Sequence, residues 1–145
     1  MLEAELWQMI KHGLSKQPRL HMCRVEDSAC SGMPDVDACR DGATAKVELK
    51  VAHGRWLHFR NSQRSWTVRR AVAGGAVFVL AHCDGSLYLW RAIDLFSAGM
   101  VNSVDDKSFK VALSDAMPLK LDAWSKPYPW NRVADALFST AETKS

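Results

Sequence analysis

The chain has little that would place it in a membrane or outside the cell. Its longest apolar stretch, residues 71–82, is interrupted by two glycines and is too short to span a bilayer. The first fourteen residues contain two glutamates and no basic segment ahead of an apolar run, so they do not resemble an export signal. We therefore expect a cytoplasmic protein whose four cysteines are reduced thiols.

The sequence also lacks the spacing of several common catalytic and metal-binding motifs. The four cysteines form no C-x-x-C pair, and the five histidines show no zinc-ligand spacing. Gly74-Gly75 is not followed by the lysine of a phosphate loop and is predicted to end a helix. The sequence therefore does not support a zinc protein or a cysteine nucleophile, and we expect the thiols in the core or in loops.

The composition is that of an ordinary globular protein. Of 145 residues, 48% are hydrophobic and 24% are charged, which allows a core without disulfide bonds. No repeat or low-complexity linker divides the chain, so we expect a single domain over residues 1–145.

Positive charge is concentrated in one segment, although the whole chain carries a net charge of only +3. Residues 46–70 contain seven Lys or Arg residues and one acidic residue, Glu48, so the segment has a net charge of +6 and the rest of the chain −3. Such a segment indicates contact with a polyanion, with a solvated helix face as an equally favoured alternative.

Apolar periodicity predicts an α/β fold. Predicted helices cover 2–14 and 62–73, predicted strands cover 20–26, 36–39, 45–52, 76–81 and 87–90, and 53–59 is predicted to be a connection. Asp41-Gly42 and Asp84-Gly85 are predicted hairpin turns. The weaker pattern beyond Arg91 suggests a short helix over 92–98, a hairpin within 100–121 and a last helix over 133–141. This order predicts a mixed central β-sheet flanked by helices.

One spacing points to chemistry: Pro34-Asp35, twelve further residues, and then Glu48-Leu49-Lys50. Side chains alternate along a strand, so Glu48 and Lys50 point to the same face. If the strand after Asp35 turns back at Asp41-Gly42 and pairs with the next, Asp35 lies beside Glu48. Two carboxylates that converge are ligands suited to Mg²⁺, and a neighbouring lysine can orient water or stabilise charge on a phosphate.

These residues resemble the PD-(D/E)xK nuclease superfamily. Gly32-Met33-Pro34-Asp35 and Val47-Glu48-Leu49-Lys50-Val51 resemble its central motif. The run 60–66, RNSQRSW, resembles the S-Q-x-x-W helix start of the VRR-NUC-like branch and of small phage-type nucleases. Arg24-Val25-Glu26 and Gly74-Gly75 also fit that branch. The resemblance covers about residues 2–90, and we assign no role to the C-terminal extension 91–145.

The resemblance implies a restriction-endonuclease-like core with a Mg²⁺-dependent active site, in which Mn²⁺ also serves. It implies that Asp35, Glu48 and the carbonyl of Leu49 bind the metal, and that Lys50 orients the attacking water or stabilises the transition state. Gln63 would form a hydrogen bond near the metal or the scissile phosphate, although a purely structural role at the helix start is the alternative.

The family also uses an acidic residue on the first helix, for which Glu3 and Glu5 are the candidates. Leu2-Glu3-Ala4-Glu5-Leu6 is similar to the E-x-E-L run of archaeal resolvases, which favours the first glutamate. Glu3 also shares a helix face with Trp7 and Ile10, predicted to be the buried side. The alternative is that Glu3 only complements the helix dipole.

The function implied is that of a DNA endonuclease acting on branched DNA, similar to a Holliday junction resolvase. Phosphate contacts without sequence specificity are expected from Arg55, Arg60, Arg64, Arg69 and Arg70. Symmetric cutting of a junction needs two active sites, so a homodimer is expected, in the host cytoplasm for a phage-encoded protein. The alternatives are a nuclease acting on RNA or on nicked, flapped or single-stranded DNA, a catalytically silent nucleic-acid-binding module, and an inhibitor protein.

Overall fold

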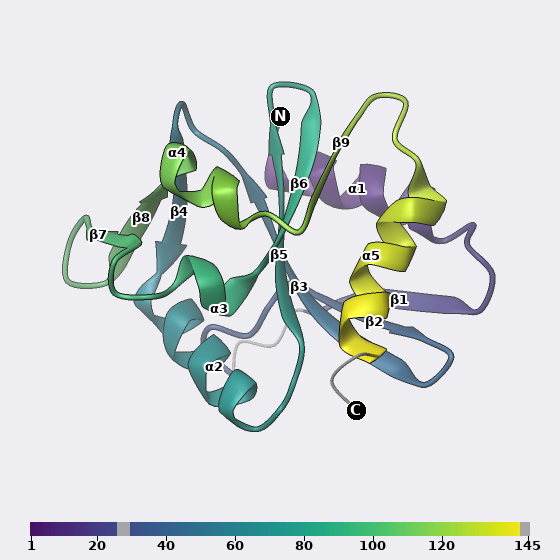
Figure 1. Cartoon of the computed structure of the whole chain (residues 1–145), viewed down its shortest axis with the longest axis horizontal. Coiled ribbons are helices and arrows are strands. Elements are labelled where there is room, and N and C mark those ends of the chain that lie inside the picture. Colours follow the sequence, from purple (N-terminus) through teal and green to yellow (C-terminus); the bar gives the residue numbers. More distant parts are fainter. Residues whose placement is uncertain (26–29, 143–145) are drawn as a thin grey trace.

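The computed structural model describes residues 1–25 and 30–142, with side chains up to residue 139, and arranges them in three layers around a six-stranded sheet. Helices α1 (Glu3–Leu14) and α5 (Trp130–Glu142) cover one face of this sheet (Figure 1). Helices α2 (Asn61–Val72) and α3 (Ala92–Leu95) and a second, three-stranded sheet cover the other face. The predicted architecture, a mixed central sheet flanked by helices, is confirmed.

The central sheet has the strand order β1-β2-β3-β5-β6-β9. Its strands are β1 (Leu20–Arg24), β2 (Val36–Arg40), β3 (Ala43–Val51), β5 (Val77–Cys83), β6 (Ser86–Arg91) and β9 (Asp122–Ser125). Among the strands of the described residues, only β3 and β5 pair in parallel, and their connection runs through α2. The predicted turns also form: Asp41 and Gly42 between β2 and β3, and Asp84 and Gly85 between β5 and β6, all have positive φ, as type I′ turns require.

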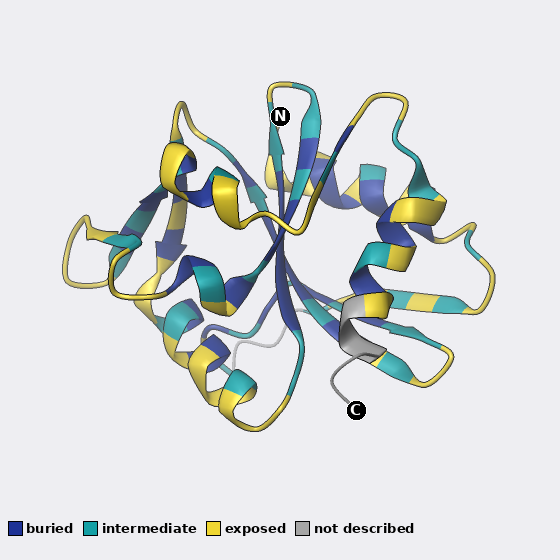
Figure 2. Ribbon diagram, in the orientation of Figure 1, coloured by how far each residue is buried: buried dark blue, intermediate teal, exposed yellow. Residues whose placement is uncertain are grey.

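The core on the α1 and α5 side is entirely apolar. Alternate residues of β3 contribute to it (Val47, Leu49 and Val51), and α1 contributes Leu6, Ile10 and Leu14 (Figure 2). Gly13 lies in the last turn of α1, which ends at Leu14 as predicted. A Cβ atom at Gly13 would overlap the indole of Trp130, so the glycine allows α1 and α5 to pack closely.

The second sheet corrects the prediction that 53–59 is only a connection. It has the order β4-β8-β7, with β4 (Trp56–Arg60), β8 (Ser108–Ala112) and β7 (Val101–Ser103). Leu57 and Phe59 are buried and alternate with exposed His58 and Arg60. This alternation covers only the five residues of β4 and does not stand out in the sequence. The partner strand β8 lies about fifty residues further along the chain, so no neighbouring segment indicates the pairing.

Residues 91–142 contribute to both sheets. The hairpin predicted within 100–121 is β7–β8, followed by α4 (Leu113–Ala116) and the 3₁₀ helix η1 (Met117–Leu119). Strand β9 adds to the edge of the central sheet, where Trp124 lies opposite Leu87. The last predicted helix is α5, which begins at Trp130, three residues before its expected start. In the described part of the chain, no helix is both long and apolar enough to cross a membrane.

Candidate active site

The register of β2 and β3 brings Asp35 to Glu48. Val36 pairs with Val47 at the end of the ladder, so Asp35, one residue earlier, lies opposite Glu48, one residue later. The Leu49 N–H donates a hydrogen bond to Asp35 Oδ2 at 3.0 Å, which holds this carboxylate at the point where β2 ends. The predicted convergence of the two acidic side chains is therefore present.

Glu48 is a buried acidic residue, with only 5% of its surface exposed. Gln63 Nε2 donates a hydrogen bond to Glu48 Oε2 at 2.9 Å, and Lys50 Nζ lies 3.6 Å from the same oxygen. Burial raises the pKa of Glu48 to about 9, the charge of Asp35 adds to this effect, and the charge of Lys50 opposes it. In the absence of a cation, this carboxyl therefore retains its proton at neutral pH.

Gln63 performs two tasks at the start of α2. Its Oε1 accepts a hydrogen bond from the Arg60 N–H at 2.8 Å, which satisfies one backbone donor at the helix start, as in a capping box. Its Nε2 holds Glu48. One buried side chain thus makes both the hydrogen bond at the helix start and a hydrogen bond to Glu48.

The loop before Asp35 packs directly on the first turn of α2. Gly32 has a φ of +85°, and a Cβ atom there would overlap the backbone carbonyl of Ser62. Only glycine permits this approach, which places the loop carrying Asp35 beside the helix turn carrying Gln63. The sequence does not reveal this role of Gly32, because the residue that it contacts lies thirty positions further along the chain.

Lys50 lies partly inside the molecule, with its side chain 11% exposed. It extends from the same face of β3 as Glu48, and its Nζ lies 5.0 Å from the centre of the Phe59 ring of β4. The second sheet therefore forms one wall of the site.

Glu3 does not lie on the buried side of the first helix, where the sequence predicted it. Glu3 and Glu5 are both exposed in the first turn of α1, so Glu3 is not on a buried helix face. The charge of Glu3 nevertheless contributes to the raised pKa of Glu48, whereas Glu5 is not among the causes of this shift. The charge of Glu3 is the smallest of the causes that act on the pKa of Glu48.

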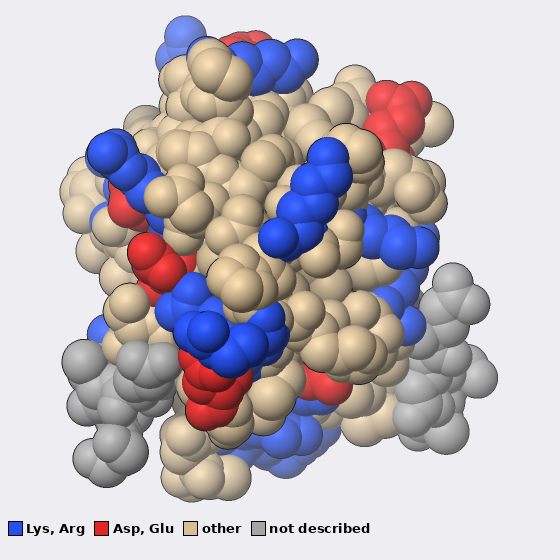
Figure 3. Space-filling view, turned by 90° about the vertical axis from the view of Figure 1, so that its right-hand side faces the viewer, with Lys and Arg blue, Asp and Glu red and all other residues tan. Residues whose placement is uncertain are grey.

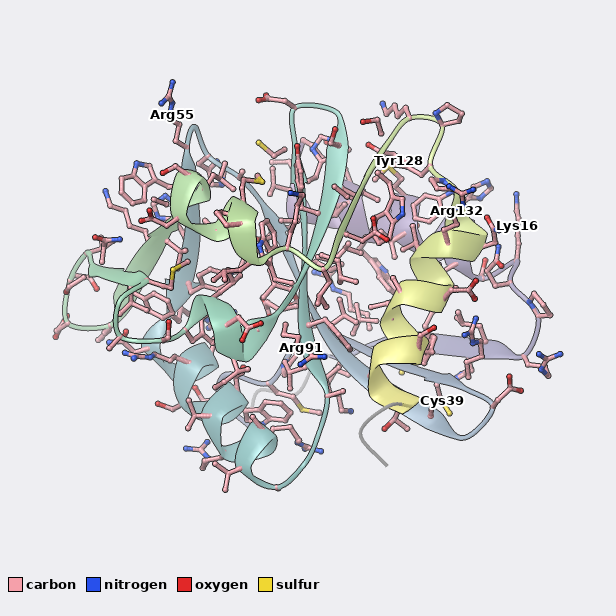
Figure 4. All side chains as sticks on the ribbon, viewed as in Figure 1. Lys16, Cys39, Arg55, Arg91, Tyr128 and Arg132 are labelled. Atoms are coloured by element: carbon pink, nitrogen blue, oxygen red, sulfur yellow. The ribbon has the colours of Figure 1, made fainter. Side chains whose placement is uncertain are left out.

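The five arginines predicted to contact DNA lie on the turn before β4, at the end of β4 and along α2. Arg64 Nε donates to the carbonyl of Phe96 at 2.8 Å, and the guanidinium of Arg70 lies 4.5 Å from the centre of the Trp66 ring. Arg60 and Arg69 are exposed at opposite ends of α2. Arg55 projects from the turn that leads into β4, away from the body of the molecule (Figure 4). Two of the five arginines, Arg64 and Arg70, are thus engaged in contacts within the molecule.

The acidic side chains around Glu48 are few. Over residues 1–25 and 30–142, no group of three or more His, Cys, Asp and Glu is arranged to hold a metal ion. The oxygen donors that lie together are the carboxylates of Asp35 and Glu48. The four cysteines are free thiols, and Cys30 Sγ accepts a hydrogen bond from the Trp66 indole at 3.3 Å.

The fold belongs to the restriction-endonuclease-like class. Among solved structures it is similar to Hjc from Archaeoglobus fulgidus, described as a Holliday junction resolvase from an archaeal hyperthermophile. The TM-score is 0.57 at 18% sequence identity, over 83% of this chain and 90% of Hjc. No protein-family model and no curated protein matches the sequence. The resemblance to Hjc therefore extends to the fold.

Proposed function

We propose that the chain is a metal-dependent endonuclease that hydrolyses phosphodiester bonds in DNA. The observation that carries this proposal is the placement of Asp35 and Glu48 opposite each other where β2 ends, with Lys50 on the same face of β3. This combination of two carboxylates and an amine suits hydrolysis of a phosphodiester by a metal-activated water.

The residues fit a hard divalent cation, Mg²⁺ with Mn²⁺ as a substitute, because the available donors are oxygens. Asp35 and Glu48 would bind it through their carboxylates. The Leu49 N–H bonds to Asp35, and in a strand the N–H and C=O of one residue point to the same side, so the Leu49 carbonyl faces Asp35 as well. Waters would complete the coordination, and the bound metal would lower the pKa of one of them.

The remaining residues act around these ligands. Lys50 would orient the attacking water or stabilise the negative charge that develops on the phosphate. Gln63 would fix the conformation of Glu48 through its hydrogen bond. Glu3 would complete the site from α1. The combination of Ser62, Gln63 and Trp66 supports placement in the VRR-NUC-like branch.

Branched DNA is the proposed substrate. It is supported by the fold shared with Hjc and by the similarity of 2–6 to the E-x-E-L run of archaeal resolvases. Two symmetric cuts at a junction would require a homodimer. Residues 91–142 pair into both sheets, so we treat 1–145 as one nuclease domain.

The test is cleavage of a labelled four-way junction beside a linear duplex, a flap and a single strand, in Mg²⁺, Mn²⁺ and EDTA. Asp35→Asn and Glu48→Gln serve as the active-site variants, and Glu5→Gln is the matched control on α1. Metal-dependent cutting of the junction, lost in the two variants and kept in the control, is expected. Preferential cutting of flaps or single strands would retain the site and change the substrate, and no cutting by folded protein in either metal would refute the nuclease.

A further inference from the structure

The outer face of the second sheet carries positive and aromatic side chains next to the candidate site. On β4, Leu57 and Phe59 point inward, where Phe59 packs on Phe96 and Phe109. Trp56, His58 and Arg60 therefore point outward. In Figure 1 this sheet lies at the left margin of the molecule, with α2 and α3 on its inner side.

The cross-strand register gathers these side chains. His58 lies directly opposite Lys110 of β8, and Lys110 Nζ lies 4.0 Å from the centre of the Trp56 ring. The rings of His53 and His58 have their centres 6.0 Å apart. Together with Arg55 at the turn, these groups form what we call the β4–β8 face: Arg55, Trp56, His58 and Lys110, with His53 beside them.

Acidic side chains are found at both ends of this sheet. The turn between β7 and β8 holds Asp105 and Asp106, near the Arg60 end of β4, as the pairing of Arg60 with Ser108 requires. The carboxylate of Asp105 is already bonded to the Lys107 N–H at 2.8 Å and to the Ser108 hydroxyl at 2.9 Å. At the other end, exposed Asp115 of α4 lies two residues after Leu113, whose N–H bonds to the Arg55 carbonyl. Among the described residues, neither Arg55 nor Lys110 forms an ion pair.

The β4–β8 face adjoins the site through one strand. Phe59 contacts Lys50 on the inner side of β4, and the preceding residue, His58, lies on the outer side. The charges of His53, Lys110 and Lys50 all act to lower the pKa of His58, after burial as the largest cause, so these groups lie near one another.

The opposite side of the molecule has a different charge pattern. Over α5 and the β1–β2 edge, basic side chains lie singly or beside acidic ones (Figure 3). Arg40 pairs with Asp135 at 2.8 Å, and Arg19 pairs with Asp41 at 2.6 Å. Two basic residues on that side, Lys16 and Arg132, provide matched controls (Figure 4).

We propose that the β4–β8 face binds the sugar-phosphate backbone of a duplex DNA arm beside the cleavage site. The positive charge favours a polyanion, and the position of Lys110 favours duplex over single-stranded DNA. Lys110 occupies one face of the Trp56 ring, so a base cannot stack on that face, as single-strand binding by aromatic side chains requires. The position of the arm rests on the proposed nuclease function, whereas binding to this face is measurable without cleavage.

The test is fluorescence anisotropy of a labelled duplex of about 25 base pairs, long enough for several phosphate contacts, titrated in EDTA over a series of salt concentrations. The variant Arg55→Gln/Lys110→Gln is compared with Lys16→Gln/Arg132→Gln, which has the same net charge. We expect Kd to rise about tenfold in the first variant and the slope of log K against log salt to fall by about 2, with little change in the second. Thermal unfolding of both variants verifies that they fold.

Each other outcome has a defined meaning. An equal effect in the two double variants, or no DNA binding by the wild-type protein, would overturn the proposal. Tighter binding of the single strand than of the duplex, lost in Trp56→Ala, would show base stacking and also overturn it. Failure of cleavage alone would refute the nuclease and leave the binding result standing, while normal cleavage with unaltered binding in Arg55→Gln/Lys110→Gln would refute the β4–β8 face alone.

Discussion

The two faces of strand β3 differ in kind. Val47, Leu49 and Val51 point into the apolar core beneath α1 and α5. Glu48 and Lys50, the residues between them, point to the opposite side, where Glu48 and Gln63 are buried polar groups. The alternation of side chains along β3 thus separates residues that stabilise the fold from residues that can take part in catalysis. Substitutions on the apolar face should lower stability and spare activity, and substitutions on the polar face should lower activity and spare stability.

The largest expected effect is that of Glu48→Gln. Cleavage should fall by at least about 10³-fold, because a metal ligand is lost. Without metal and at alkaline pH, the Glu48→Gln variant should nevertheless be more stable than the wild-type protein. Glu48 keeps its proton in the folded state up to about pH 9 but loses it near pH 4.5 when unfolded, so the stability of the wild type falls as pH rises between these values.

Urea unfolding in EDTA at pH 6 and pH 8.5 measures this second effect. The difference in free energy of unfolding between Glu48→Gln and the wild type should grow by up to about 3 kcal/mol from pH 6 to pH 8.5. Each pH unit within the interval contributes about 1.4 kcal/mol. An advantage that does not change with pH would show that Glu48 is ionised in the metal-free protein.

Leu49→Ala should show the reverse pattern. Leu49 is 2% exposed in the apolar core, and its truncation should lower the free energy of unfolding by about 2–5 kcal/mol. Its backbone N–H and C=O stay in place, so cleavage per folded molecule at low temperature should be close to that of the wild type. Denaturant titration measures the free energy of unfolding, and the cleavage rate divided by the concentration of folded protein measures activity. Leu49→Met, which conserves side-chain volume, is the control. A large loss of activity in folded Leu49→Ala would mean that the two faces are not separable.

Gly32→Ala should reduce both stability and cleavage, each by a smaller amount than the substitutions in β3. The added methyl group would meet the Ser62 carbonyl at a positive φ, so we expect a loss of about 1–3 kcal/mol and weaker cleavage. Gly42→Ala is the matched control, because Gly42 also has a positive φ but open space around its Cβ position. Cleavage that falls equally in both variants, measured at equal folded fraction, would argue against a specific role of the Gly32 contact.

The smallest expected effect concerns His58. Its pKa is lowered by burial and by the charges of His53, Lys110 and Lys50, so it is largely neutral at pH 7 in the free protein. A phosphate bound beside it would favour the protonated ring, and duplex affinity should rise a few-fold between pH 7.5 and pH 6. In His58→Gln this rise should shrink, whereas His21→Gln, on β1, should retain it. Anisotropy titrations at constant salt would detect the difference.

The sequence predicted those parts of the molecule in which local signals agree with the fold. Asp41-Gly42 is a turn signal between two short strands, and it fixes the register that brings Asp35 to Glu48. Prediction from the sequence was wrong where a strand pairs with a distant strand. It was also wrong where helical periodicity placed a residue on a buried face although the residue lies at the exposed start of the helix. Strand β4 depends on β8, and Glu3 is exposed because α1 begins at that residue.

The positive segment of the sequence has a similar limit. The sequence does not show that Arg64 bonds to a backbone carbonyl or that Arg70 contacts Trp66. It also does not show that Lys110, a residue outside that segment, lies opposite His58 through strand pairing.

The double engagement of Gln63 couples the candidate active site to the local stability of a helix end. When the first turn of α2 frays, the amide that bonds to the Arg60 N–H is released, and Glu48 loses its anchor in the same event. Opening of this turn therefore inactivates the site without global unfolding. The exchange rate of a few backbone amides at the start of α2 would report how often the site is assembled, and ligands that bind to Glu48 should slow that exchange even though they touch no part of the helix backbone.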